Sequence, residues 1–263
     1  MEWFKNFVKF NDLYIYEFRS RKEEGNRVTA GILNYMDINH NKIARVLDIP
    51  CGIGRISRGF LDRGMHVTGI DISEPYLSEF GKSVAESRNS KNLTLVNADF
   101  KNFQTYLDNR EFDLIINWWT SFGYTTQQDD VEFFGKLLTV SHRDTMLMVE
   151  TWHRKYITNH KINVSYKDLG KIVVVNENTF LDNDSTVITT HRYYKKSGKN
   201  LIFLNQFDSA IKLYTEKELL AMMNDSGWEV MDVFNDIETM EKFNSTRDRI
   251  VIIAKPRKGP YQL

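Results

Sequence analysis

The stretch that decides the fold is Val46–Ser57, with the sequence VLDIPCGIGRIS. An apolar run ends at Asp48, a tight turn with Gly52 and Gly54 follows, and a helical pattern then begins. This order predicts a strand, a glycine turn and a helix start, and glycines there let the backbone approach a ligand where a Cβ would collide with it. Because glycine loops and helix N-termini already favour anions, a carboxylate beside this loop favours a nucleotide-like ligand that carries positive charge.

Two further strands are expected to end near acidic residues. Asp71 ends the second strand and follows Asp48 by 23 residues, close to the offset at which doubly wound folds place a ribose-binding carboxylate. A carboxylate accepts hydrogen bonds from both hydroxyls of a cis-diol. A third strand, Leu93–Val96, precedes Asp99 and Phe100. These two residues are candidates to accept a hydrogen bond from a purine amine and to lie against its ring face.

With these residues the chain resembles the class I S-adenosylmethionine-dependent methyltransferases. The resemblance covers residues 43–150 and resumes at 213–219 and 226–228. It departs from the family pattern at Pro50, which stands where the family has its first loop glycine, and at Ser141–Asp144, where Pro-Gly-Gly is usual. Four motifs in order carry it: Asp48–Gly54, Gly69–Asp71, Asn97–Asp99 and Phe112–Asn117.

The resemblance implies an α/β fold, a doubly wound Rossmann-like sheet of seven mostly parallel strands, with S-adenosylmethionine as cofactor. It implies that the glycine turn approaches the methionine part, that Asp71 takes the ribose hydroxyls and that Asp99 takes the adenine amine. Cys51 is expected to be a packed, unreactive thiol, because it has no obvious activating partner. The residues assigned to cofactor binding are Asp48, Cys51, Gly52, Gly54, Arg55, Asp71, Ile72, Asp99, Phe100 and Asn117.

The hydrophobic patterning divides the chain into four parts. Residues 1–40 are expected to form an N-terminal helical cap, and residues 41–152 and 213–255 the Rossmann-like cofactor-binding domain. Residues 153–212 show four strand patterns separated by turn signals, which predict an antiparallel β insertion that acts as a substrate lid. Residues 256–263 are expected to be a tail. Ser73 and Thr215 are the expected N-caps of two helices.

The segment that follows strand four is expected to face the transferred methyl group, since ligands in such folds bind at the carboxyl ends of strands. Trp118, Ser121 and Tyr124 are therefore assigned to the substrate, although one of the two tryptophans at 118 and 119 is expected to pack the sheet edge. Ser121–Tyr124 resembles a segment of small-molecule methyltransferases that methylate sugar amines or glycine nitrogen.

His153 follows strand five and is the candidate general base for a hydroxyl or amine acceptor, because histidine titrates near neutrality. A solvent-facing loop histidine is the alternative. His191, with two nearby tyrosines in the insertion, is expected to serve sheet packing. Either Tyr14 or Tyr16 is a candidate to close over the cofactor from the N-terminal helices, and the sequence does not choose between them.

Composition narrows the functional classes. The 263 residues have a formal net charge of zero, which argues against a general nucleic-acid-binding surface. A single cysteine excludes an intramolecular disulfide and favours the cytoplasm. No apolar run approaches the roughly 18 residues that span a membrane, and the N-terminus lacks the pattern of a signal peptide. No metal ligands are assigned.

The function predicted from these features is S-adenosylmethionine-dependent transfer of a methyl group to an O or N atom of a small-molecule acceptor. An RNA or protein methyltransferase and a non-catalytic cofactor-binding scaffold are the alternatives. An NAD-dependent oxidoreductase is disfavoured, because the loop lacks the full Gly-x-Gly-x-x-Gly spacing and follows Asp48. The identity of the acceptor and the oligomeric state stay open.

Overall fold

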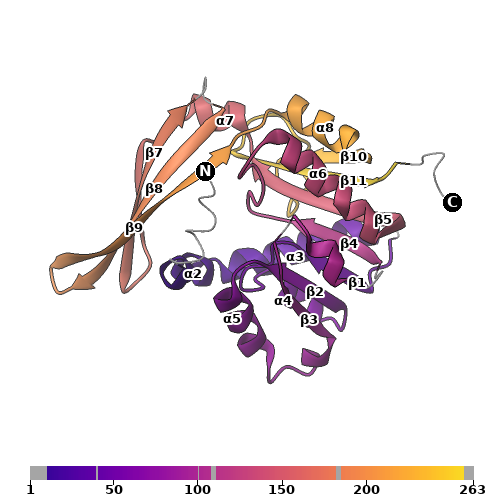
Figure 1. Ribbon diagram of the computed structural model, residues 1–263, viewed down its shortest axis with the longest axis horizontal. Coiled ribbons are helices and arrows are strands. Elements are labelled where there is room, and N and C mark those ends of the chain that lie inside the picture. The colour runs from indigo at the N-terminus through magenta and orange to yellow at the C-terminus, as the bar shows by residue number, and fades with distance from the viewer. Residues whose placement is uncertain (1–10, 40, 100, 108–110, 182–184, 258–263) are drawn as a thin grey trace.

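Two β-sheets organise the chain (Figure 1). The computed structural model describes residues 11–39, 41–99, 101–107, 111–181 and 185–257. The larger sheet has seven strands in the order β10-β11-β5-β4-β1-β2-β3, and the smaller has four in the order β6-β7-β8-β9. The predicted α/β fold, with a mostly parallel seven-stranded sheet and an antiparallel insertion, is confirmed.

In the larger sheet, β11 runs antiparallel to both β5 and β10, and all other neighbours are parallel. The strand order reverses beside β1, which lies between β2 and β4, and ligands in open α/β sheets bind at such a point, beyond the carboxyl ends of the strands. The strands are β1 (Arg45–Asp48), β2 (His66–Asp71), β3 (Leu93–Asn97), β4 (Phe112–Asn117), β5 (Ser141–Trp152), β10 (Trp228–Phe234) and β11 (Arg249–Pro256).

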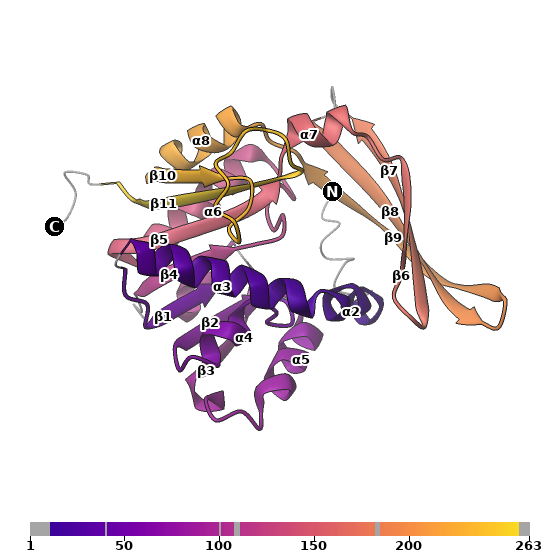
Figure 2. The ribbon, with the colours of Figure 1, turned by 180° about the vertical axis from the view of Figure 1, so that it is seen from behind.

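Helices cover both faces of this sheet (Figure 2). Side chains of α3, α4 and α5 pack on one face, and those of α6 and α8 pack on the other. The predicted caps are present: Ser73 accepts from the Tyr76 amide, and Thr215 forms a capping box with Glu218. The helices are α2 (Asn11–Ser20), α3 (Lys22–Ile38), α4 (Ser57–Leu61), α5 (Glu74–Val84), α6 (Gln127–Leu137), α7 (Arg154–Asn159) and α8 (Glu216–Asp225), with 3-10 turns η1 (Ser90–Asn92), η2 (Phe103–Tyr106) and η3 (Leu138–Val140).

The alternation of side chains along the central strands explains why the middle of these strands is largely apolar. In β4, Ile115 packs with the α6 and α8 layer, whereas Leu114 and Ile116 pack with the α3, α4 and α5 layer. The strands of a sheet covered on both faces are therefore near-continuous apolar runs. Charged side chains of the central strands lie near the strand ends, where Asp48 and Asp71 stand at the carboxyl edge.

The inserted sheet comprises β6 (Val164–Asp168), β7 (Ile172–Leu181), β8 (Thr186–Ser197) and β9 (Asn200–Lys212), all antiparallel. One face of this sheet changes character along its length. Its apolar part packs against residues of α2, which lies between the two sheets (Figure 2). Further along the same face the side chains are polar. The apolar part consists of Ile172, Val174, Tyr193 and Phe207.

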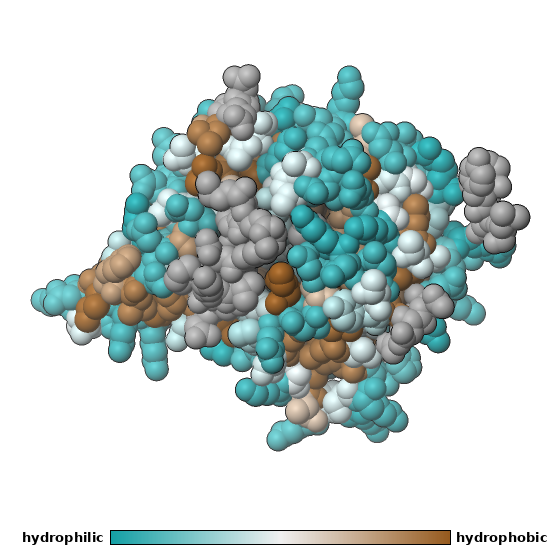
Figure 3. All heavy atoms as spheres, viewed as in Figure 1, coloured by the Kyte–Doolittle hydropathy of each residue, from teal (hydrophilic) through white to brown (hydrophobic). Residues whose placement is uncertain are grey.

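The β8–β9 hairpin projects away from the larger sheet (Figure 1). Four consecutive apolar side chains, Leu201–Leu204, are exposed near its end, where the surface is brown in Figure 3. None of the four lines the cavity described below. Among the described residues, no helix combines the length and the apolar character needed to cross a membrane.

Two helical glycines offer a matched test of how closely α3 approaches the glycine loop. A Cβ on Gly25 in α3 would lie 2.3 Å from the carbonyl oxygen of Arg55, whereas one on Gly81 in α5 would have its nearest neighbour at 3.5 Å. Gly25→Ala is therefore expected to lower the free energy of unfolding by about 1–3 kcal/mol through overpacking. Gly81→Ala is expected to raise it by about 0.5–1 kcal/mol. Urea unfolding measures both, and equal effects would contradict the close approach.

Candidate active site

A cavity of about 410 Å³ lies beyond the carboxyl ends of β1, β2 and β4. Three walls enclose it: the loops that follow these strands, the helix α2 and the polar part of the inserted sheet. The strand ends of the large sheet meet the insertion here, so residues from both halves of the chain face one space. The predicted residues that line it are Asp48, Cys51, Gly52, Arg55, Asp71 and Ile72 on the cofactor side, and Trp118, Ser121 and Tyr124 on the substrate side.

Asp71 ties the end of β2 to the glycine loop. Its Oδ2 accepts a hydrogen bond from the Gly52 amide at 2.8 Å, and its Oδ1 accepts one from the Ser73 amide at 2.8 Å. Gly52 has a φ of +53°, a conformation that favours glycine. Burial raises the pKa of Asp71 to about 6, since the charged form is poorly solvated there. A ligand with hydroxyl donors or positive charge would restore the charged form.

Asp48 is a second buried carboxylate on the same wall. Only 3% of its surface is exposed, and the Ser57 hydroxyl donates to its Oδ2 at 2.6 Å. Burial raises its pKa to about 7, and the negative charge of Asp71 adds to this. Two acidic groups at one end of the cavity give that end a chemical preference for a cation.

Two residues of the glycine loop shape it without any reactive chemistry. Gly54 does not line the cavity; it has a φ of +74°, and a Cβ on it would lie 2.3 Å from the Phe80 ring, so packing requires glycine there. Cys51 is buried, and burial raises the pKa of its thiol well above the usual value. The thiol is therefore protonated and weakly nucleophilic, as expected for a packing role.

Other residues assigned to the cofactor lie away from the lining. Asp99 accepts the Lys101 amide at 2.9 Å, and Asn117 is buried beneath the cavity with its Nδ2 donating to the Ile49 carbonyl at 2.8 Å. Neither lines the cavity. Phe100 falls outside the described residues. The roles of Asp99 and Phe100 toward an adenine ring stay predictions.

His153 does not line the cavity, so its geometry gives no support to a general base at this position. The preceding residue, Trp152, lines the cavity, and alternation along the chain turns the histidine to the opposite side. Its ring packs edge-on against Phe243 at 4.8 Å, and only 2% of the residue is exposed. The alternative of a solvent-facing histidine is therefore wrong. Burial lowers its pKa, which keeps the ring uncharged.

Helix α2 supplies a wall that the sequence motifs do not identify. Tyr14 lines the cavity and Tyr16 does not, so of the two candidates Tyr14 has the position that closure over a cofactor requires. Phe18 lies over the glycine loop: the nearest atom of its ring is 3.6 Å from the position that a Cβ on Gly52 would take. The centre of its ring lies 5.2 Å from the centre of the Trp119 ring. Helical periodicity marks these residues as one face but gives no sign of what that face covers.

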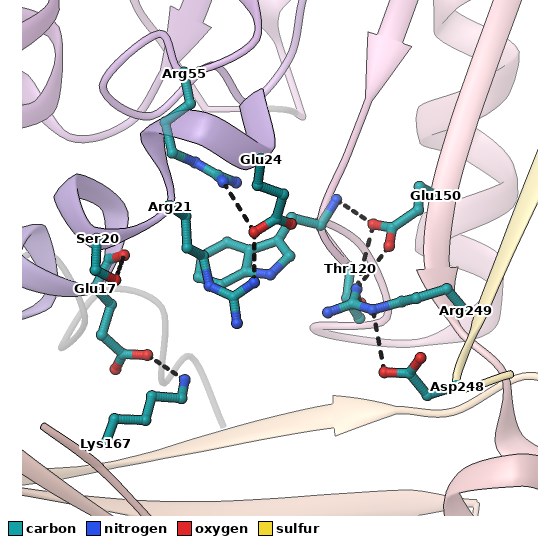
Figure 4. A network of polar contacts seen from close by, with 11 residues as sticks. Glu17, Ser20, Arg21, Glu24, Arg55, Thr120, Glu150, Lys167, Asp248 and Arg249 are labelled. Carbon is teal, nitrogen blue, oxygen red and sulfur yellow. Dashed lines mark hydrogen bonds and ion pairs between the residues drawn. The ribbon is translucent and has the colours of Figure 1, made fainter. Parts of the chain in front are cut away.

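The turn after β4 has an unusual backbone. Trp119 and Thr120 have φ values of 66° and 56°, in the left-handed region that costs energy for residues other than glycine. The guanidinium groups of Arg21 and Arg55 lie 5.0 and 4.9 Å from the Trp119 ring centre, within cation–π range. Glu24 pairs with both arginines (Figure 4). The indole is thus held at the cavity by arginines from the junction of α2 and α3 and from the glycine loop.

A buried ion pair holds this strained turn in place (Figure 4). Glu150 Oε2 accepts the Trp119 amide at 2.7 Å, and Glu150 Oε1 pairs with Arg249 at 3.0 Å. Arg249 also donates to the Thr120 hydroxyl oxygen at 3.0 Å, and that oxygen accepts the Trp152 amide. Strands β5 and β11 therefore fix the backbone of the loop between them and the cavity.

The inserted sheet contributes a wall of neutral polar side chains. His191 belongs to it, which corrects the expectation that this histidine only packs the sheet. Burial lowers the pKa of His191 to about 4, so the imidazole is uncharged at neutral pH. The signal in the sequence is a polar residue at every second position of a strand. The wall comprises Ser165, Asn176, Asn178, Thr189, His191 and Ser209, with the charged Lys167 paired to Glu17 of α2.

Comparison with known proteins agrees with this geometry. Residues 46–143 match the family model described as a methyltransferase domain. This part of the chain is therefore similar to a methyltransferase domain. A Bacillus subtilis (strain 168) protein, YqeM, whose name marks it as a candidate methyltransferase, is 29% identical over 107 residues. That match spans 40% of this chain and 41% of YqeM.

Solved structures share the whole architecture at low sequence identity. An S-adenosylmethionine-dependent methyltransferase from Clostridium acetobutylicum ATCC 824 aligns with a TM-score of 0.76 at 19% identity, over 95% of this chain and 99% of that one. CalS10, an amino pentose methyltransferase from Micromonospora echinaspora, aligns with a TM-score of 0.70 at 16% identity, over 92% and 96%. KedS8, a sugar N-methyltransferase from Streptoalloteichus sp ATCC 53650, aligns with a TM-score of 0.72 at 11% identity, over 93% of each.

These likenesses establish the fold that the sequence motifs predict, that of the class I S-adenosylmethionine-dependent methyltransferases. Together with the domain match, they support the predictions of a transferase and of S-adenosylmethionine as its cofactor. The mostly parallel sheet, the cavity at its carboxyl edge and the antiparallel insertion are all accounted for by this one fold.

The buried pair beneath the strained turn gives a stability prediction. Replacing Glu150 with Ala removes the closer acidic partner of Arg249, which keeps its contact with Asp248, and frees the Trp119 amide, so unfolding should become easier by about 1–3 kcal/mol. Glu177→Ala is the matched control, because Glu177 pairs with Arg192 on the exposed side of the insertion and should cost less than about 1 kcal/mol. Urea denaturation of both variants measures the difference. Similar small losses would show that the pair does not hold the turn.

Proposed function

We propose that this protein is an S-adenosylmethionine-dependent methyltransferase that methylates an O or N atom of a small-molecule acceptor. The observation that carries the proposal is the pair of buried carboxylates, Asp48 and Asp71, that flank a glycine turn in the cavity wall. This set suits an adenosine-bearing cation: the acids favour its charge and ribose hydroxyls, and Gly52 leaves room for close approach of its chain.

The residues of the chain act by placing and enclosing the reactants. When bound, S-adenosylmethionine supplies a methyl group already activated by its positively charged sulfur. Asp71 would hold the ribose and the loop at Gly52 the methionine part. The aromatic rings of Tyr14, Phe18 and Trp119 would exclude water from the space between cofactor and acceptor. Positioning and exclusion of water are effective when one partner is already reactive.

The acceptor pocket is assigned to the side of the cavity that faces the inserted sheet. Trp118, Ser121 and Tyr124 stand on the large-sheet side of this space, and hydroxyl, amide and imidazole groups stand on the other. A neutral polar wall suits a molecule with many hydroxyl or amino groups, such as a sugar amine. The structural similarity to CalS10, an amino pentose methyltransferase, and to KedS8, a sugar N-methyltransferase, supports the same class.

The alternative functions differ in the molecules that must enter the cavity. An RNA or protein substrate would have to thread a single residue past α2 and the inserted sheet, and the chain as a whole has no net charge to attract nucleic acid. A scaffold without activity would bind the cofactor and show no turnover. Measurements of cofactor binding and of turnover distinguish these alternatives from the proposed function.

The deciding experiment is isothermal titration calorimetry with S-adenosylmethionine and with NAD, followed by a turnover assay. Binding of the first and not the second is expected, with formation of S-adenosylhomocysteine when a panel of amino sugars and hydroxylated small molecules is supplied. Failure to bind S-adenosylmethionine would sink the proposal. Binding without turnover on the panel, but with turnover on RNA or protein substrates, would favour the alternative acceptors.

Asp71 provides the first prediction for cofactor binding. Asp71→Asn replaces a charged acceptor of two ribose hydroxyls with a neutral amide and should weaken binding by about 2 kcal/mol, a factor of about 30. Asp225→Asn is the control, since Asp225 lies exposed at the end of α8, away from the cavity. Calorimetry gives both dissociation constants. Equal affinities for the two variants would remove Asp71 from the site.

The raised pKa of Asp71, about 6 without ligand, predicts how affinity depends on pH. Below pH 6 the carboxyl is protonated, so the cofactor must displace a proton and its affinity should fall by up to about tenfold per pH unit. Above pH 7 Asp71 is ionised and its share of this dependence disappears, whereas Asp48, with a pKa of about 7, still contributes up to about pH 8. Calorimetry at several pH values between 5.5 and 8 tests this, and the slope should decrease in Asp71→Asn. An affinity independent of pH in the unsubstituted protein would contradict it.

A further inference from the structure

Three side chains on the polar face of the inserted sheet form a continuous hydrogen-bonded chain. His191 Nδ1 lies 2.9 Å from Asn176 Oδ1, and His191 Nε2 lies 2.9 Å from Ser209 Oγ. Strands β7, β8 and β9 supply one residue each, and Asn176 and His191 are direct partners in the strand register. All three residues line the cavity.

The orientation of the Asn176 amide sets the direction of this hydrogen-bond chain. Asn176 presents its Oδ1 atom to the ring, and because an amide oxygen only accepts, the Nδ1 atom of His191 carries the hydrogen. The Nε2 atom then has a free lone pair, and the Ser209 hydroxyl donates to it. The Ser209 oxygen keeps lone pairs that a molecule in the cavity can use. Hydroxyl, imidazole and carbonyl stand in the order in which serine–histidine–aspartate triads move a proton.

Building on the proposed methyl transfer, we propose that Ser209, His191 and Asn176 are the proton-accepting chain of this site. The N–H or O–H of the acceptor hydrogen bonds to Ser209 Oγ. As the acceptor atom bonds to the methyl group and releases its proton to Ser209, the Ser209 proton passes to His191 Nε2. Asn176 is a positioning residue that holds the imidazole in the required tautomer.

The step balances in charge and protons. The bond from cofactor sulfur to methyl breaks with its electron pair staying on sulfur, so one positive charge is lost there. The released proton places one positive charge on the His191 ring, and Ser209 is regenerated as a neutral hydroxyl. The imidazolium then gives its proton to water and the chain returns to its starting state.

The surroundings of His191 suit a group that is neutral at rest and briefly charged. Burial keeps the ring uncharged near neutral pH, and its Nε2 lone pair is therefore available. Glu17 on α2 and Asp208 on β9 favour the protonated form, and Lys167 on β6 opposes it. The ring of Phe207 stacks on the imidazole at 4.7 Å. Glu17 is itself 2% exposed and lines the cavity, where it pairs with Lys167 and accepts a hydrogen bond from the Tyr193 hydroxyl.

The hydrogen-bonded chain of Ser209, His191 and Asn176 also faces the place where the methyl group is expected. The centre of the Tyr14 ring lies 6.1 Å from the centre of the His191 ring and 6.0 Å from that of the Trp119 ring. Tyr14 therefore lies between the inserted sheet and the turn after β4. An acceptor held between Ser209 and this turn would have its nucleophilic atom between the two walls.

Nuclear magnetic resonance of the full chain tests the hydrogen-bond chain without any acceptor. In protein labelled with 15N-histidine at pH 7, His191 should be the Nδ1–H tautomer, and Ser209→Ala should shift its Nε2 resonance. The resonance is assigned by its loss in His191→Gln. Ser197→Ala, at the exposed end of β8, is the matched control and should leave the resonance in place. An Nε2–H tautomer, or no response to Ser209→Ala, would overturn the proposal.

Kinetics test the role of the chain with the best acceptor from the panel of amino sugars and hydroxylated molecules. Ser209→Ala and His191→Gln should each lower kcat by about 10- to 100-fold, with the affinity for S-adenosylmethionine measured by calorimetry unchanged. Ser197→Ala should behave as the unsubstituted protein does. Unchanged kcat in Ser209→Ala, with cofactor binding and turnover intact, would contradict the proposed proton-accepting role of Ser209, His191 and Asn176. The proposed function of the protein would not be affected by that result.

Asn176→Asp separates a proton-accepting role from a structural one. A carboxylate beside Nδ1–H favours the protonated ring, so the acid limb of the kcat–pH profile should move up by at least one pH unit. A packing role alone predicts no such movement. Absence of S-adenosylmethionine binding would instead show that the proposed function is wrong. The tautomer measurement would still test the hydrogen-bond chain of Ser209, His191 and Asn176, because it needs no cofactor.

Discussion

The hydrogen bond from the Gly52 amide to the buried Asp71 carboxylate is the contact on which the site depends. It joins the end of β2 to the loop after β1 and so sets the edge of the cavity. The loop in turn receives α3, where Gly25 lies against the Arg55 carbonyl, and α2, where Phe18 covers Gly52. Without that link, the helices that close the cavity would have no fixed surface to pack on.

The two sides of the cavity are chemically different, and this difference follows from how each is built. On the large-sheet side, parallel strands buried on both faces place their charged groups near their ends, so a few acids are concentrated there. On the insertion side, one face of an antiparallel sheet is free to alternate, and it presents many neutral polar groups in rows. The first arrangement suits a cation and the second a molecule with many hydrogen-bonding groups.

Local sequence signals predicted the fold and the cofactor side because those features depend on neighbours in the chain. The segment Val46–Ser57 contains the signals for a strand, its acidic end and a glycine turn. Asp71, the acid at the end of the next strand, follows Asp48 by 23 residues. The α2 wall and the insertion wall depend on contacts between distant segments. His153 illustrates the limit: its place after β5 suggested a base, but alternation turned it away, whereas His191 was brought to the cavity by strand pairing.

The strained turn at Trp119 and Thr120 connects the two halves of the site. Left-handed backbone at two successive residues other than glycine persists only where surrounding contacts determine it, and here Glu150 and Arg249 from β5 and β11 supply those contacts. The turn places Trp119 against Tyr14, whose ring also meets His191 of the insertion. The ion pair of Glu150 and Arg249 at the edge of the cavity therefore helps to set how the wall with the acids and the wall of the inserted sheet face each other.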